Sequence, residues 1–175
     1  MIRKLLFTVV LLAIVFAMAS TVSGSLLGVR WHRAANLTII DSTFTPQWTQ
    51  ALNKALSDWS ASPYVGFTEK AGSGCTINRR AISICEFNDP DAAVTYIYAE
   101  IYLQNSYIIA ARVMLNDAGY EGGVPTQPQA DHVLCQEIGH ALGVGHNNRL
   151  TSCMGGGYAP DDLDYADLAT LYGPG

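Results

Sequence analysis

The stretch from Gln136 to His146 constrains this chain more than any other part of its sequence, and it reads QEIGHALGVGH. Gln136 and His140 are four residues apart, so on a helix both side chains lie on one face, one turn from each other. Gly143 allows the chain to leave that helix through a left-handed backbone conformation that other residues resist. The spacing therefore predicts a helix, a glycine turn and three polar side chains that converge on one metal ion, with His146 as the third.

One substitution, Gln136→His, would turn this stretch into the extended zinc motif HExxHxxGxxH. In that motif two ligands share one helix face, and the Glu beside the first ligand holds and deprotonates the metal-bound water. We therefore expect zinc to be bound by Gln136, His140 and His146, with Glu137 as the catalytic base. The alternative for Glu137 is a solvated carboxylate on the helix surface.

Gln136 has three readings that the sequence leaves open. In the first, its amide oxygen is the third ligand, although a neutral amide is a poorer donor to zinc than imidazole. In the second, Gln136 hydrogen-bonds a water that fills the third position. In the third, the site is inactive and the scaffold survives as a binding protein. The retained Glu137 favours the first two, because a relic that only binds metal needs no base.

Three further segments accompany this motif, and together they resemble metzincin metallopeptidases, most of all the matrixin branch. Ser152-Cys153-Met154 ends eight residues after His146, where metzincins carry a Met-turn. Residues 161–173 resemble the acidic-capped terminal helix of matrixins, and Trp31 followed by residues 36–40 resembles their entry strand. The resemblance covers residues 30–173, and Gln136 is its clearest departure.

The resemblance implies an α/β (α+β) chain with a zincin-like fold: a twisted mixed β-sheet with an active-site helix, a Met-turn and a C-terminal helix. It implies a secreted zinc-dependent metalloendopeptidase that hydrolyses peptide bonds in proteins, with Met154 packed under the metal. The substrate would lie extended along the sheet edge beside the helix. The alternative is an inactive metzincin-fold pseudopeptidase, a secreted module that binds a protein or peptide.

The first 19 residues predict a signal peptide, with Arg3 and Lys4 before an apolar core and a small-x-small cleavage site at residues 17–19. Retention as a membrane anchor is the alternative. We assign residues 20–30 to a short N-terminal segment and residues 31–175 to one catalytic domain, which we expect to be a monomer. Residues 20–35 are predicted to be a flexible remnant of the leader. The leader holds two of the ten Lys and Arg residues, so eight remain against 15 Asp and Glu, a net charge of −7. This acidity argues against a nucleic-acid partner.

Four cysteines in an exported chain predict two disulfides, and their order permits three pairings. We favour Cys75–Cys85, which would staple a local hairpin, and Cys135–Cys153, which would tie the metal helix to the Met-turn. A loop of the second length contributes about 3 kcal/mol in the chain-entropy model. The alternative is that Cys135 or Cys153 binds the metal.

Hydrophobic periodicity gives the other elements. Trp48, Leu52, Leu56 and Trp59 recur at helical spacing after Thr45-Pro46, which predicts a helix over residues 46–59 with a Thr45 N-cap and both tryptophans in the core. Strands are expected at residues 36–40, 64–68, 94–102 and 107–115, with a hairpin of residues 75–77 and 81–85 and a turn at 104–106. The metal helix should begin near residues 130–131.

Several other polar residues are weaker candidates for ligands of a metal ion. His132 shares a helix face with Gln136 and His140. However, eight residues, or about 12 Å of helix rise, separate it from His140, which is too far for both to bind one ion. A surface histidine at the start of the helix is therefore favoured. Tyr158 follows the Met-turn and is a candidate to approach the metal or the oxyanion. Calcium is a weaker expectation for a set of carboxylates whose spacing matches no calcium loop, and surface turns are their default reading: Asp89, Asp91 and Asp117.

Overall fold

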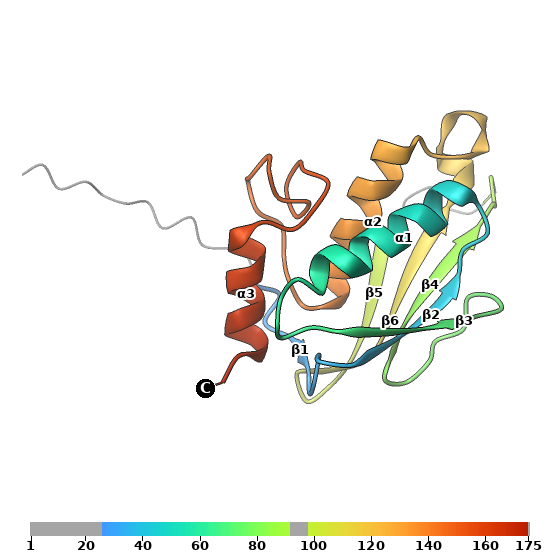
Figure 1. The fold of residues 1–175 in the computed structure, drawn as a ribbon. Coiled ribbons are helices and arrows are strands. Elements are labelled where there is room, and N and C mark those ends of the chain that lie inside the picture. The colour runs from blue at the N-terminus through green and yellow to red at the C-terminus, as the bar shows by residue number, and fades with distance from the viewer. Residues whose placement is uncertain (1–25, 92–97, 175) are drawn as a thin grey trace, which may run out of the picture.

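The computed structural model describes residues 26–91 and 98–174 of the chain. They form a mixed α/β structure in which three helices accompany one six-stranded, mainly parallel sheet (Figure 1). In chain order the elements are β1 (Arg30–Trp31), β2 (Leu37–Ser42), α1 (Pro46–Trp59), β3 (Phe67–Ala71), β4 (Ala81–Phe87), β5 (Tyr98–Gln104), β6 (Tyr107–Asn116), two short 3₁₀ turns (Asp117–Gly119 and Glu121–Gly123), α2 (Gln127–Ala141) and α3 (Asp162–Tyr172).

The sheet is parallel except at one edge. β3, β2, β4 and β6 lie side by side in that order and run in one direction, while β5 pairs with β6 in the opposite direction. β1 pairs with the first residues of β6 and β4 pairs with the later ones, both on the side of β6 that β5 does not occupy. As a result the parallel strands begin at a common end of the sheet, and β5 forms the antiparallel edge.

Helices α1 and α2 pack together over one face of the sheet (Figure 1). The predicted bounds of α1 are confirmed, and its apolar stripe is buried, including Trp48 and Trp59 at 0% exposure. Both indole N–H groups find partners: Trp48 donates to Asp117 Oδ1 at 2.7 Å and Trp59 donates to the Cys135 carbonyl at 2.9 Å. The predicted Thr45 N-cap has the expected extended backbone but makes no side-chain capping bond.

The predicted strands are present with shifted limits. β2 and β3 begin one and three residues later than expected, because the pairing of Leu37 with Phe67 sets their common start. β6 is one residue longer than predicted. The turn before it has Asn105 and Ser106 in the left-handed region, with φ of 51° and 64°, as tight hairpins require. The first part of the strand expected at 94–102 lies outside the described residues, and β5 begins at Tyr98.

The predicted hairpin of residues 75–77 and 81–85 is wrong, since only its second half forms a strand, β4. Both edges of β4 are already paired, one with β2 and the other with β6. No edge is left for a hairpin partner, so residues 75–77 form an irregular segment. Its Cys75 carbonyl instead accepts a hydrogen bond of 2.8 Å from Arg112 Nη1.

Helix α2 begins at Gln127, three residues before the predicted start. The Gln129 side chain accepts hydrogen bonds from both the N–H and the hydroxyl of Thr126, each at 2.8 Å. These bonds belong to a capping box that stabilises the N-terminus of the helix. Pro128 lies in the first turn of α2, where proline is tolerated because its missing N–H leaves no helical hydrogen bond unmade.

The expectation that residues 20–35 are a flexible remnant is wrong for their described part. Arg30–Trp31 form β1, and the Trp31 indole, at 4% exposure, donates to the Ala141 carbonyl at 2.7 Å. The Leu27 N–H donates to the Gly143 carbonyl at 3.0 Å. Residues 20–25 and the predicted signal peptide lie outside the described residues. The segment before β2 therefore packs against the end of α2.

Both predicted disulfides are confirmed, Cys75–Cys85 and Cys135–Cys153, and no cysteine of the described chain is free. This excludes either cysteine of the second pair as a metal ligand while the bond is intact. Disulfides are typical of proteins that fold outside reducing compartments. Within residues 26–91 and 98–174, none of the helices has the length and apolar character needed to cross a membrane.

Candidate metal centre

The end of α2 and the turn after it carry the predicted site. Gln136, Glu137 and His140 lie in the last turns of the helix, which stops at Ala141. Gly143 then adopts a φ of 95°, and a Cβ added at this position would collide with the Val29 carbonyl oxygen. Glycine is required here for both reasons, as the sequence predicted from conformation alone.

The turn at Gly143 brings the two candidate histidine ligands together. The ring centroids of His140 and His146 are 4.5 Å apart and the rings are inclined by 66°. His140 is half-buried and His146 is exposed, so the pair lies at the protein surface. The structure thus joins two of the predicted ligand side chains, which belong to a helix and to the loop that follows it.

The hydrogen bonds of His140 fix which of its nitrogens is free. Nδ1 lies 2.9 Å from the Val144 carbonyl oxygen. A carbonyl oxygen only accepts, so Nδ1 carries the hydrogen and Nε2 keeps its lone pair. Burial lowers the pKa of His140, and the neighbouring His146 lowers it further against the opposing effect of the Val144 carbonyl. Burial therefore favours the neutral ring, and the Val144 contact selects the tautomer that metal-binding histidines adopt when their second nitrogen is held by the backbone.

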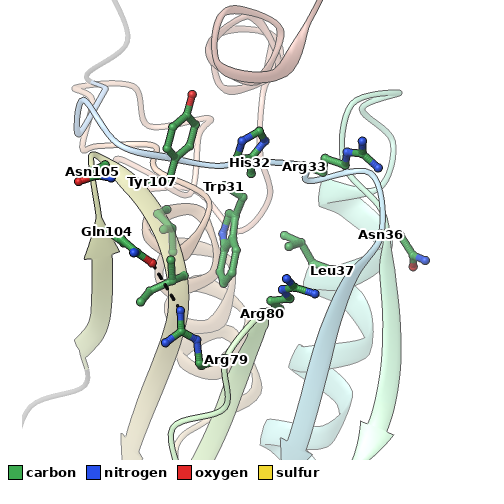
Figure 2. A pocket seen from close by; sticks show the side chains of 12 residues that line it. Trp31, His32, Arg33, Asn36, Leu37, Arg79, Arg80, Gln104, Asn105 and Tyr107 are labelled. Carbon is green, nitrogen blue, oxygen red and sulfur yellow. Dashed lines mark hydrogen bonds between the residues drawn. The ribbon is translucent and has the colours of Figure 1, made fainter.

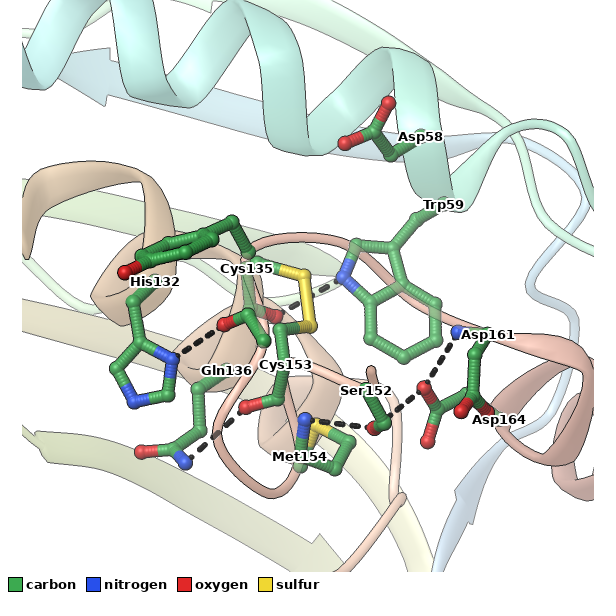
Figure 3. The surroundings of a disulfide bond; sticks show 12 residues. Asp58, Trp59, His132, Cys135, Gln136, Ser152, Cys153, Met154, Asp161 and Asp164 are labelled. Atoms are coloured by element: carbon green, nitrogen blue, oxygen red, sulfur yellow. Dashed lines mark hydrogen bonds between the residues drawn. A yellow bond between two sulfur atoms is a disulfide. The ribbon is translucent and has the colours of Figure 1, made fainter. Parts of the chain in front are cut away.

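Gln136 is held in the same manner. Its Nε2 donates to the Cys153 carbonyl oxygen at 3.2 Å (Figure 3). Because a carbonyl cannot donate, the amide nitrogen must face Cys153, and the side-chain oxygen points away from that contact. Gln136 and His140 thus each direct their donor to a main-chain carbonyl and keep an acceptor atom for another partner.

Glu137 is the buried member of the site, with 7% of its surface exposed. Burial raises the pKa of its carboxyl group to about 7, while a hydrogen bond with the main chain of Ala99 lowers it. Ala99 belongs to β5, the antiparallel edge strand. The reading of Glu137 as a solvated surface carboxylate is wrong, because the side chain faces the sheet edge and its pKa is close to neutral pH.

The Met-turn segment packs directly against α2. Met154 is fully buried, and a Cβ added to Gly139 would collide with its sulfur and lie 2.7 Å from the ring of Trp59. Glycine at position 139 therefore allows the close approach of turn and helix. The Cys135–Cys153 disulfide joins the same two segments covalently (Figure 3).

Helix α3 holds the Met-turn from the other side. The buried Asp164 carboxylate accepts hydrogen bonds from the Ser152 hydroxyl at 2.7 Å and from the Asn147 amide at 2.9 Å. The Asn147 N–H in turn donates to the Met154 carbonyl at 2.9 Å. The loop after His146, the turn at Met154 and the C-terminal helix are consequently linked through one carboxylate.

His132 has a packing role. Its Nδ1 lies 2.6 Å from the Gly157 carbonyl oxygen, and its ring meets the edge of Tyr158 at a centroid distance of 6.4 Å. Tyr158 itself is 55% exposed, and its carbonyl accepts from Lys54 at 2.9 Å. Both side chains therefore join the segment after the Met-turn to the helices, and no contact links either one to His140 or His146.

The three carboxylates considered for calcium form no common site in the described residues. Asp117 is buried and accepts the Trp48 N–H; burial raises its pKa to about 6, and the adjacent Glu86 carboxylate contributes to the rise. Asp89 Oδ1 instead accepts the main-chain N–H of Asp91 at 3.0 Å, a surface turn contact. Across residues 26–91 and 98–174 no group of three or more His, Cys, Asp or Glu side chains is placed to hold a metal.

Sequence reasoning missed the main-chain partners of the site. The carbonyls of Val144 and Cys153 and the backbone of Ala99 orient His140, Gln136 and Glu137, as described above. Main-chain groups are present at every residue, so no residue type at these positions signals the role. Only the fold determines which of them face the site.

No protein-family model matches this chain, and no curated protein resembles it with significant sequence similarity.

Proposed function

We propose that this chain is a secreted zinc-dependent endopeptidase with a zincin-like fold, most like the matrixin branch of the metzincins. The observation that carries the proposal is the shared geometry of Gln136 and His140. Each is one helical turn from the other, and each donates to a main-chain carbonyl while an acceptor atom stays free. A buried glutamate with a near-neutral pKa lies beside them.

The types of donor atom in these side chains suit a zinc ion. The imidazoles of His140 and His146 and the amide oxygen of Gln136 would hold it, which is one imidazole fewer than the fully matching motif provides. The orienting carbonyls of Val144 and Cys153 are the kind of outer partners that fix ligand rings and raise ligand basicity. When bound, zinc would polarise the scissile carbonyl and acidify a water molecule.

Glu137 supplies the proton chemistry. Its carboxylate accepts a proton from the attacking water and then passes that proton to the amine that leaves. A general base works best when its pKa lies near the operating pH, and burial raises the pKa of Glu137 to about 7. The main-chain bond with Ala99 keeps the carboxylate from turning away.

The edge strand β5 supports an extended peptide as the substrate. In the described residues β5 pairs with β6 on one side only. Its Ala99 main chain contacts Glu137, so the unpaired edge of β5 runs beside the candidate base. A peptide that adds to this edge through main-chain hydrogen bonds would bring its scissile bond close to Glu137.

The arrangement of elements supports the zincin-like assignment. A mixed sheet is covered by α2, which carries the candidate ligands, and a buried methionine turn lies under that helix. The C-terminal helix α3 begins at the Asp161 N-cap, as the resemblance implies for an acidic-capped helix.

The test is the zinc content of the purified chain beside its His140→Ala and Glu137→Gln variants. We expect one zinc per chain, its loss in His140→Ala, and its retention in Glu137→Gln. Cleavage of an unfolded protein substrate should fall by about 10²–10⁴-fold in Glu137→Gln, which is the usual contribution of a general base. A chain without zinc at micromolar supply would overturn the proposal and favour a binding protein on the same fold.

The Gln136→His variant tests the ligand set. The imidazole is a better donor to zinc than the amide oxygen, so we expect tighter zinc binding in competition with a chelator. The circular dichroism spectrum should stay unchanged, because position 136 is only half-buried. Unaltered zinc affinity would show that Gln136 is not a ligand.

A further inference from the structure

A second concave site lies where the strands of the sheet begin. A cavity of about 960 Å³ opens at the first residues of β1, β2 and β6, beside the residues that precede β4 and the turn that follows β5. Figure 2 shows its lining. None of the residues of the candidate metal centre lines it. Its volume is within the range of about 300–1,000 Å³ that is typical of small-ligand pockets.

Every charged side chain in this lining is basic. Arg33, Arg79 and Arg80 contribute guanidinium groups, His32 adds an imidazole, and no Asp or Glu is present. The whole chain carries 15 Asp and Glu against ten Lys and Arg, so an acid-free surface around three arginines departs from its overall composition. This cluster could not be predicted from local sequence, because Arg33 is far along the chain from Arg79 and Arg80.

The three arginines have no acidic partner in the described part of the chain, where the ion pairs involve other cations. The one side-chain hydrogen bond among their guanidinium groups is a long contact of 3.5 Å from Arg79 Nη2 to Gln104 Oε1 (Figure 2). A guanidinium group carries five donors, so most of this donor capacity is left for solvent or a ligand.

The backbone that presents Arg79 and Arg80 is fixed. Arg80 has a φ of 62°, a left-handed conformation that residues with a side chain adopt only when their surroundings impose it. Its N–H donates to the Ile109 carbonyl at 2.7 Å, and the Cys75–Cys85 disulfide closes the loop around it. The backbone from which the two arginine side chains project is thus held before any ligand arrives.

The floor of the cavity is apolar. Trp31, Leu37 and Ile108 are all buried and line it beneath the exposed arginines. An apolar floor excludes water and strengthens charge-assisted hydrogen bonds above it. The more exposed aromatic surface in the lining is the stacked pair of His32 and Tyr107, whose ring centroids are 4.7 Å apart and against which another ring can pack.

We propose that this cavity binds a sulfate or phosphate ester carried on a sugar-sized ring. Arg33, Arg79 and Arg80 contact the oxyanion oxygens, and the rings of His32 and Tyr107 contact the sugar-sized ring. Planar guanidinium groups suit this ligand because they bind tetrahedral oxyanions through two parallel hydrogen bonds.

The test is calorimetric titration of the full chain with two probes, sucrose octasulfate and inorganic pyrophosphate. We expect one octasulfate bound per chain, with an affinity about tenfold weaker in Arg79→Gln and in Arg80→Gln, since each change removes charge-assisted hydrogen bonds. The matched control is Lys70→Gln, which removes one positive charge from an exposed position in β3 outside the cavity. It should leave the affinity unchanged.

The outcomes separate specific binding from general attraction of anions. Binding of octasulfate that depends on the two arginines and not on Lys70 supports an ester on a ring. If only pyrophosphate binds, and its affinity falls in Arg79→Gln and Arg80→Gln but not in Lys70→Gln, the oxyanion site is supported and its ligand is free phosphate. Loss of affinity by the same factor in all three variants, or no binding of either probe, overturns the proposal. Thermal unfolding of each variant verifies that it is folded.

Discussion

The candidate metal centre and the arginine-lined cavity use opposite means to prepare for a ligand. In the first, Gln136 and His140 are held by main-chain carbonyls and Glu137 is buried, so the side chains are oriented at the cost of partial desolvation. In the second, Arg79 and Arg80 are exposed and lack acidic partners, and the backbone that carries them is fixed.

The difference follows from the chemistry of the two kinds of group. Imidazole and amide ligands are neutral, so they can be oriented by hydrogen bonds in a half-buried position without a large desolvation penalty. Guanidinium groups stay charged at all accessible pH values and are expensive to bury without a partner. The fold therefore orients the side chains of Gln136 and His140 by hydrogen bonds to main-chain carbonyls. For Arg79 and Arg80 it holds only the backbone that carries them.

The largest expected effect comes from removing the disulfides one at a time. Replacing both members of either pair, Cys135–Cys153 or Cys75–Cys85, by serine should lower the free energy of unfolding by about 3 kcal/mol, because the loops span 18 and 10 residues. Urea unfolding measures this loss.

The same two double variants test whether the regions are independent. We expect the first to weaken zinc binding and leave octasulfate binding unchanged, and the second to do the reverse. If both variants lost zinc binding and octasulfate binding to the same extent while still folded, the two regions would form one cooperative unit. They would then not be independent sites.

A smaller effect is expected from Gly139→Ala, which tests the packing of the turn at Met154 against α2. The added methyl group would collide with Met154 and Trp59, so stability should fall by about 1–3 kcal/mol, as overpacked cores do. Thermal unfolding measures the change. The control is Gly156→Ala, whose methyl group would meet the flexible end of the Leu150 side chain at 3.0 Å and the Leu150 Cα at an ordinary contact distance of 3.7 Å. Its stability should change by less than about 0.5 kcal/mol. Equal effects would contradict the close approach of turn and helix.

The smallest expected effect is on the pH dependence of the free energy of unfolding. It arises from Asp117, which belongs to neither the candidate metal centre nor the arginine-lined cavity. The pKa of Asp117 in the folded chain is raised to about 6, above the unfolded value of 3.8, chiefly by burial. The folded state therefore binds this proton more tightly, and the associated stability is present below pH 3.8 and is lost as pH rises through about 6.

Asp117→Asn should remove this dependence while its amide oxygen still accepts the Trp48 N–H. We expect the decrease in stability between pH 4 and pH 7 to be smaller by roughly 1–2 kcal/mol in the variant. Urea unfolding at a series of pH values measures it. An identical pH profile in the wild-type chain and the variant would assign the dependence to another group.

Local signals predicted the parts of the fold that depend on neighbouring residues. The bounds of α1 followed from its apolar stripe and the Thr45-Pro46 start, and the left-handed Gly143 followed from the end of the metal helix. The hairpin at residues 75–85 failed because competition for the edges of β4 is decided by β2 and β6, which are distant in sequence. Residues 94–97 lie outside the described residues, so that part of the strand prediction has no structural counterpart.

The sequence by itself determined the candidate ligands, the glycine turn between them and the favoured disulfide pairs, because these depend on helical spacing, backbone conformation and covalent chemistry. The tertiary structure decided that Glu137 is buried against β5 and that Gln136 faces Cys153 with its amide nitrogen. It also brought Arg33 to the same cavity as Arg79 and Arg80. These outcomes depend on which distant segments pack together, and parallel strands that begin at one end of a sheet join residues that no local pattern connects.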